Sequence, residues 1–135
     1  MVMTVFAIPK PFRGHINVIQ RNAITSWTRL SPRPEIILFG NEDGTARIAR
    51  ELGLRHVPDV RCNEFGTPLL SDLFEKAQGL ATRGTLRYVN AGILLLRDFM
   101  KAVEQVASWR DRFLMVGRRT NLDVDHLQDS ALCCW

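Results

Sequence analysis

The chain contains little cysteine and little histidine. Its three cysteines are Cys62 and the adjacent pair Cys133 and Cys134, and its three histidines are widely separated. An odd number of cysteines, two of them neighbours, does not make a disulfide framework, and so few ligands give no zinc-binding spacing. The sequence therefore predicts neither a disulfide scaffold nor a zinc module, and it indicates a reducing compartment, the cytoplasm.

Long apolar runs and runs of basic residues are also absent. The run Ala91 to Leu96 ends at Arg97, far short of the roughly 20 apolar residues that cross a bilayer. The apolar start of the chain lacks the positive region that precedes the core of a signal peptide. The 18 Lys and Arg residues against 14 Asp and Glu give a net charge of +4, without a basic stripe interleaved with aromatics. We therefore expect no membrane span and no nucleic-acid partner, whereas a mildly basic surface suits a small anionic ligand.

Three short motifs with known chemistry are missing. No G-x-G-x-x-G follows the first apolar run, no G-x-x-x-x-G-K-[ST] occurs anywhere, and no serine stands in a G-x-S-x-G context. The first two motifs hold dinucleotides and nucleotide phosphates, and the third presents the nucleophile of many hydrolases. The sequence therefore supports none of these three classes.

The chain does show short apolar runs that alternate with amphipathic segments. The runs are continuous rather than alternating, which is typical of a parallel sheet buried on both faces. They predict strands at 4–9, 35–40, 54–58, 85–96 and 112–117, with helices at 16–30, 45–52, 68–81 and 98–109 between them. This order predicts an open, mostly parallel, Rossmann-like α/β sheet with helices on both faces. We expect one domain over residues 1–125, followed by an irregular tail over 126–135, with Trp27, Phe65 and Trp109 in the core.

The fourth predicted strand is interrupted at its centre. Asn90, Ala91 and Gly92 separate the apolar residues Tyr88 and Val89 from the run that follows. A glycine inside a strand marks either a bulge or a place where another group approaches the backbone closely. A polar amide such as Asn90 at a buried strand end needs a partner. The interruption is therefore either a bulge or part of a ligand site.

Several segments in order along the chain carry a family resemblance. "TVFAIPKPF", "EIILFGNEDG", "NEFGTPLLSDLFEKAQ", "LRYVNAGILLLRDF" and "FLMVGRRTNLDVD" resemble the amino-terminal half of nucleotide-diphospho-sugar transferases, family-two-like glycosyltransferases with the GT-A fold. The resemblance extends from about Met3 to Asp125. It implies a protein that binds a nucleotide-diphosphate sugar and transfers the sugar to an acceptor.

At "YVNAGILLL" the chain departs from the pattern of that family. The resemblance implies Tyr-Val-Asn-Ala-Asp, with an acid at Gly92 that holds Mn²⁺ or Mg²⁺ against the diphosphate. Such cations prefer hard oxygen ligands, and glycine offers none, so Asn90 is the remaining candidate ligand. The resemblance also implies a further half that builds the acceptor site. The alternative is therefore a truncated, non-catalytic nucleotide-binding module, and an incomplete sheet edge predicts self-association.

The remaining candidate residues lie in loops after predicted strands, where open parallel sheets bind ligands. Pro9 and Lys10 line a nucleoside pocket with Lys10 near phosphate, or they form a rigid loop with a solvated lysine. Asn41 and Glu42 hydrogen-bond to base or ribose, or they form a polar turn. Gly66 and Thr67 open a helix that begins at Pro68, where N–H groups face a phosphate or Thr67 serves as a plain cap.

Overall fold

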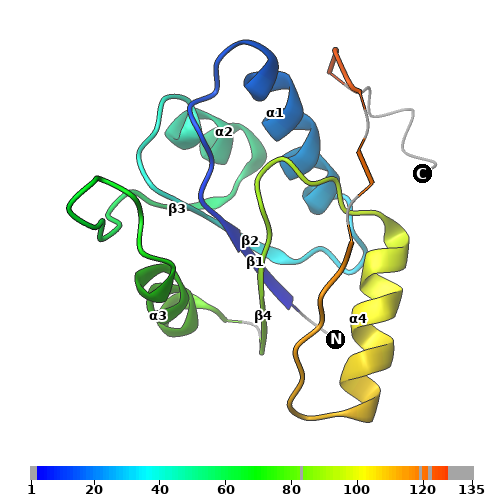
Figure 1. The fold of residues 1–135 in the computed structure, drawn as a ribbon. Helices are drawn as coiled ribbons and strands as arrows, with labels where there is room; N and C mark the ends of the chain where they lie inside the picture. Colours follow the sequence, from blue (N-terminus) through cyan, green and yellow to red (C-terminus); the bar gives the residue numbers. More distant parts are fainter. Residues whose placement is uncertain (1–2, 83, 119, 122, 128–135) are drawn as a thin grey trace.

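The computed structural model describes residues 3–82, 84–118, 120–121 and 123–127. The elements alternate between strand and helix, as the sequence predicts (Figure 1). In chain order they are β1 (Met3–Ala7), α1 (Gly14–Thr28), β2 (Glu35–Phe39), α2 (Thr45–Leu52), β3 (Arg55–Val57), α3 (Leu70–Leu80), β4 (Thr85–Tyr88) and α4 (Arg97–Trp109). Of the predicted tail, residues 128–135 lie outside the described residues. The described residues contain no helix long and apolar enough to cross a bilayer.

The four strands form one parallel sheet in the order β3-β2-β1-β4. Val5 of β1 is paired with Ile36 of β2 on one side and with Arg87 of β4 on the other. All five residues of β1 are buried, because strands flank it at both edges and side chains cover both of its faces. This double burial accounts for the continuous apolar run. The predicted α/β class with a parallel, Rossmann-like sheet is confirmed.

Successive residues of β1 feed two separate apolar clusters, one on each face of the sheet. Val5 belongs to the larger cluster, which is completed by side chains of α1, α2 and α4. Phe6 belongs to the smaller cluster, with Leu73 and Ala77 of α3. Figure 1 shows α3 apart from the other three helices. Helices therefore cover both faces, as predicted, but three of them share one face.

The predicted fifth strand at 112–117 is wrong. This segment pairs with no strand, and its residues form no hydrogen bond with any other described residue. Phe113 instead stacks on the side chain of Arg87, and Met115 packs against the larger cluster, whereas Leu114 and Val116 are exposed. Because its contacts are with side chains, the segment lies over a face of the sheet rather than beside β4 (orange in Figure 1).

The fourth strand is shorter than predicted. β4 ends at Tyr88, and residues 93–96 form neither strand nor helix before α4 begins. Between them Ile93 N donates to Asn90 O at 3.0 Å, which closes a turn. The interruption therefore ends the strand, and the bulge interpretation is wrong.

Of the three aromatic residues predicted to lie in the core, one is buried and two are exposed. Trp27 is fully buried, and its indole Nε1 donates to Ile93 O at 2.9 Å, so this core assignment is confirmed. Phe65 and Trp109 are 82% and 83% exposed, so theirs is wrong. Trp109 is the last residue of α4 and Phe65 lies in the loop before α3, where no second layer covers them within the described structure.

Candidate functional site

The strand order creates a switch point between β1 and β4. The chain passes from β1 to β2 and β3 in one direction and then returns to β4 on the other side of β1. Ligands of open α/β sheets bind at the carboxyl ends of the strands beside such a point. Pro9 and Lys10 follow β1 there, and Asn90 follows β4.

Two consecutive residues of α1 hold these two strand ends together. Gln20 hydrogen-bonds to the backbone of Lys10, and Ile19 Cγ2 lies 3.2 Å from where a Cβ at Gly92 would be. Val89 N also donates to Phe6 O at 3.0 Å, which extends the contact of β4 with β1 past the strand end. The structure therefore brings the predicted residues Pro9, Lys10 and Asn90 to one place.

Gln20 is a site residue that the sequence analysis missed. Its side chain is 3% exposed, its Oε1 accepts from Lys10 N at 2.7 Å, and its Nε2 donates to Lys10 O at 2.8 Å. This reciprocal pair fixes the backbone of Lys10, while the ammonium is exposed and forms no ion pair with a described residue. The sequence did contain a signal for Gln20, since it is a polar amide on the buried side of an amphipathic helix and such a group needs a hydrogen-bond partner.

The loop after β2 is fastened to the loop after β1. Phe12 N donates to Asp43 O at 2.8 Å, and the side chains of Arg13 and Asp43 form an ion pair. Asn41 and Glu42, both exposed, therefore stand at the same edge of the sheet as Lys10. Glu42 O also accepts from Thr45 N at 3.1 Å, so the backbone of Glu42 starts α2 while its carboxylate faces solvent. The polar-turn and ligand interpretations are compatible here.

Asn90 finds its partner within its own turn. Its Oδ1 accepts from Gly92 N at 3.1 Å, an Asx turn of the kind that asparagine commonly forms. Gly92 has no positive φ, and a Cβ at this position would be 3.6 Å from Asn90 Oδ1. An acid in place of Gly92 would therefore stand beside the amide oxygen of Asn90.

The donor set at this turn does not fit a divalent cation. Ca²⁺ and Mg²⁺ take six or more oxygen ligands, usually with one or more carboxylates, and the turn offers one amide oxygen that already accepts a hydrogen bond. No group of three or more His, Cys, Asp or Glu side chains within the described part of the chain is arranged to hold a metal. Of the two cationic side chains in the loop after β1, Arg13 is paired with Asp43, whereas Lys10 forms no ion pair with a described residue.

The prediction that Gly66 and Thr67 open a helix is wrong. α3 begins at Leu70, and Thr67 N donates instead to Asn63 Oδ1 at 3.0 Å. Asn63 N in turn donates to Thr67 O at 2.9 Å, so Gly66 and Thr67 close a tight loop. Asparagine competes for these backbone groups and delays the helix. This loop connects β3 to α3, and no hydrogen bond joins Gly66 or Thr67 to Lys10 or Asn90 within the described residues.

Two partly exposed aromatic rings lie next to the switch point on the α3 face. Tyr88, paired in register with Phe6, and Phe74 of α3 both pack edge-on against the buried Phe6 ring, at centroid distances of 5.7 and 5.0 Å. Partial burial raises the pKa of the Tyr88 phenol. Exposed aromatic faces at a strand end offer a surface on which a planar or sugar ring can stack.

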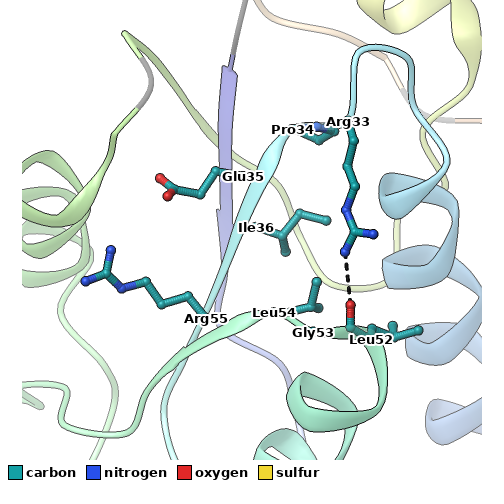
Figure 2. Close-up of a pocket in the computed structure, with 8 residues that line it drawn as sticks. All are labelled: Arg33, Pro34, Glu35, Ile36, Leu52, Gly53, Leu54 and Arg55. Carbon is teal, nitrogen blue, oxygen red and sulfur yellow. Dashed lines mark hydrogen bonds between the residues drawn. The ribbon is translucent and has the colours of Figure 1, made fainter.

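A pocket of about 600 Å³ lies at the opposite, amino-terminal edge of the sheet, lined by residues 33–36 and 52–55 (Figure 2). Arg33 projects to one side of β2, and Glu35 and Arg55 project to the other. Arg33 donates to Leu52 O at 3.0 Å, and Arg55 donates to Leu80 O at 2.9 Å. These side chains already have partners, which makes this pocket the weaker candidate despite its volume.

Glu35 is likewise engaged in structural hydrogen bonds. It accepts from Thr4 Oγ1 at 3.1 Å and from Thr82 N and Oγ1 at 3.1 and 2.9 Å. Burial acts to raise the pKa of Glu35, but the hydrogen bonds from Thr82 and Thr4 outweigh it and lower the pKa below its ordinary value. This carboxylate ties the start of β4 to β1 and β2 rather than facing a ligand.

Comparison of the chain with protein families, with curated proteins and with solved structures found no match. The class of protein is therefore defined by its fold, an α/β protein with a Rossmann-like parallel sheet. Its candidate ligand site is the β1/β4 switch point, with Lys10, Asn90 and the joined loop of Asn41 and Glu42.

Proposed function

We propose that the chain binds a nucleotide-diphosphate sugar at the β1/β4 switch point, as a glycosyltransferase-like protein that passes the sugar to an acceptor. The observation that carries this proposal is that Gln20 and Ile19 hold the exposed Lys10 and the Asn90 turn against one helix at the carboxyl ends of neighbouring strands. The resemblance of "YVNAGILLL" and "EIILFGNEDG" to that family supports the same ligand class.

Each part of the proposed ligand has a chemically suited group at this edge. The Lys10 ammonium, fixed through its backbone and without an ion pair in the described structure, meets the negative charge of the diphosphate. Asn41 and Glu42 offer hydrogen-bond partners for ribose or base, and the Tyr88 and Phe74 rings offer a stacking surface. The Mn²⁺ or Mg²⁺ that the family resemblance implies is not counted among these groups, because the Asn90 turn of the native chain does not fit a divalent cation.

A second candidate, nucleotide binding without sugar transfer, is favoured by Gly92. Transfer in this class relies on a cation that neutralises the leaving diphosphate. The turn at residues 90–92 lacks the carboxylate that would hold the cation. Under this second function Lys10 and the loops retain a nucleotide, but no acceptor reaction follows.

Calorimetric titration of UDP and GDP, each with and without Mn²⁺, separates the two candidates. The native chain is compared with Gly92→Asp, which places a carboxylate beside Asn90 Oδ1 at the cost of a small shift of Ile19. Gly84→Asp is the matched control, because it adds the same charge in open space at the opposite end of β4.

Both candidates predict that the native chain binds at least one nucleotide. Nucleotide binding without transfer predicts that Mn²⁺ tightens binding about tenfold or more, a gain of about 1.4 kcal/mol, in Gly92→Asp only. Mn²⁺-dependent binding already in the native chain would favour the transferase over the binding module. A folded chain that binds neither nucleotide under any condition would contradict both functions.

A further inference from the structure

Arg87 is a positively charged side chain on a core-facing side of the sheet. It lies next to the end of β4, in register with Val5, and it projects from the same side of the strand as Val89, a member of the larger cluster. Its Nε and Nη2 atoms are shielded from solvent, and neither has a hydrogen-bond partner. No described carboxylate forms an ion pair with it. Two shielded N–H donors without partners are costly for a charged group, and partial burial also lowers the pKa of Arg87.

The two unpartnered atoms, Nε and Nη2, form a pair of donors with which arginine binds carboxylate and phosphate groups. Nε–H and Nη2–H lie along one edge of the planar guanidinium and point the same way, so they can bind two oxygens of one phosphate or carboxylate group. The central carbon of the guanidinium lies over the ring of Phe113, 4.9 Å from the ring centroid. The ring attracts the cation through its π face but supplies no oxygen acceptor for these two donors.

The segment that covers Arg87 is held weakly. Residues 112–117 form no hydrogen bond with other described residues, and their inward contacts are the side chains of Phe113 and Met115. A segment attached by few apolar contacts opens at small free-energy cost. An oxyanion can therefore reach the edge of Arg87 when this segment moves aside.

We propose that Arg87 is an oxyanion-binding residue, whose Nε and Nη2 bind two oxygens of a phosphate or carboxylate group beneath the 112–117 segment. The site lies on the face covered by α1, α2 and α4, whereas Tyr88 and Phe74 flank the nucleotide site from the α3 face. It is therefore a second anion site, and it does not depend on the proposed function. The oxyanion comes either from a phosphorylated ligand or from a small carboxylic acid.

Thermal unfolding of the full chain tests this proposal. The midpoint is measured in potassium phosphate and in potassium succinate against potassium chloride at equal ionic strength. The variants are Arg87→Met, which keeps the length of the side chain, and Arg87→Lys, which keeps the charge without the fork. Arg33→Met is the matched control, because Arg33 is exposed and already donates to a backbone carbonyl.

Phosphate stabilises many proteins non-specifically, and that part of the shift appears equally in all variants. We expect an additional rise of several degrees in the native chain and in Arg33→Met, which is lost in Arg87→Met and reduced in Arg87→Lys. In chloride, Arg87→Met should melt above the native chain, because it removes a partly buried charge with two unpartnered donors. A larger response to phosphate than to succinate indicates a phosphorylated ligand, and the reverse indicates a carboxylic acid.

Two results would overturn the proposal. One is an equal anion response in the native chain and Arg87→Met, including no response in either. The other is an Arg87→Met variant less stable than the native chain in chloride, since that result means that Arg87 is already satisfied in the folded state.

Discussion

At the scale of single residues, the candidate site depends on a buried amide. The side-chain amide of Gln20 takes the place of the water that would otherwise hydrate the backbone of Lys10. Its oxygen accepts from Lys10 N, and its nitrogen donates to Lys10 O. The Lys10 ammonium is thereby positioned through the backbone rather than through a contact of its own. Under the proposed function, Gln20 should therefore affect both stability and nucleotide binding.

Replacing Gln20 by methionine should therefore have two effects. The variant keeps the side-chain volume but leaves two polar backbone groups of Lys10 without partners, which should lower the free energy of unfolding by about 2 kcal/mol. Urea denaturation measures this loss, and UDP or GDP titration should show weaker binding. The matched variant Gln78→Met, on the exposed side of α3, should change stability by less than about 0.5 kcal/mol. Equal losses in the two variants would contradict the assignment of Gln20.

Asp72 of α3 holds the loop that follows β3 through a hydrogen bond with its backbone. It is buried, and its Oδ2 accepts from Arg61 N at 2.8 Å and from Lys76 Nζ at 3.0 Å. The hydrogen bond from Arg61 N and then the one from Lys76 hold the pKa of Asp72 below its ordinary value of 3.8. A carboxylate with a lowered pKa stabilises the folded state above its unfolded pKa, and this stabilisation is lost as the pH falls through the folded value.

We therefore expect Asp72→Asn to be less stable than the native chain at neutral pH. The difference should shrink as the pH falls past 3.8 toward the lower folded value, because the native carboxylate is then protonated. Urea denaturation in buffers from about pH 7 to pH 3 measures it. Glu75→Gln removes an exposed carboxylate of the same helix and serves as the control. A difference for Asp72→Asn that stays constant over this range would refute the pairing.

At the scale of elements, the site depends on the contact between the loops after β1 and β2. Gly44 has φ +90°, and a Cβ there would lie 2.7 Å from Phe12 Cβ. Glycine is therefore required twice, by the backbone conformation and by the close approach of Phe12. This contact and the Arg13–Asp43 ion pair hold Asn41 and Glu42 beside Lys10.

Gly44→Ala should destabilise the chain by about 3 kcal/mol, because backbone strain and a steric clash add. Gly53, at the other end of α2, also has a positive φ, but it has open space around its would-be Cβ. Gly53→Ala should therefore cost only about 1 kcal/mol. Thermal or urea unfolding compares the two variants, and a cost for Gly53→Ala as large as that for Gly44→Ala would show that the loop contact contributes nothing.

The sequence predicted most elements but not where several of them end. Periodicity identified four strands and four helices, and the predicted bounds of α2, residues 45–52, agree with the structure. The errors lie where a local hydrogen bond competes with an element. The Asn90 side chain ends β4 early, and the Asn63 side chain accepts from Thr67 N, which holds Thr67 in a loop where a helix cap was expected. Such competition is decided by geometry that single-sequence patterns do not contain.

The predicted fifth strand failed for a different reason. Residues 112–117 have the apolar composition of a strand, but a strand also needs a neighbour in the sheet, which is a non-local requirement. Phe113 instead contacts the Arg87 side chain, and the segment pairs with no described strand. The sequence pattern does not indicate that Arg87 would be partly buried there.

At the scale of the whole molecule, strand order decides which predicted residues meet. The candidate loops were all visible in the sequence, but their grouping depends on the order β3-β2-β1-β4. That order brings Lys10 and Asn90 together at the switch point, whereas Gly66 and Thr67 lie in the loop that connects β3 to α3. The amino-edge pocket between residues 33–36 and 52–55 had no sequence signal, because arginine and glutamate at strand starts are common on surfaces.

The central claim is that the ligand site is the carboxyl edge of the sheet at β1 and β4. The most direct test is to map amide chemical-shift changes in the ¹⁵N-labelled chain during titration with UDP and with GDP. The account predicts that the amides of Lys10, Asn41 and Asn90 shift together in a saturable manner, while those of Arg33 and Arg55 stay in place. Shifts confined to residues 33–36 and 52–55, or none from a folded chain, would contradict it.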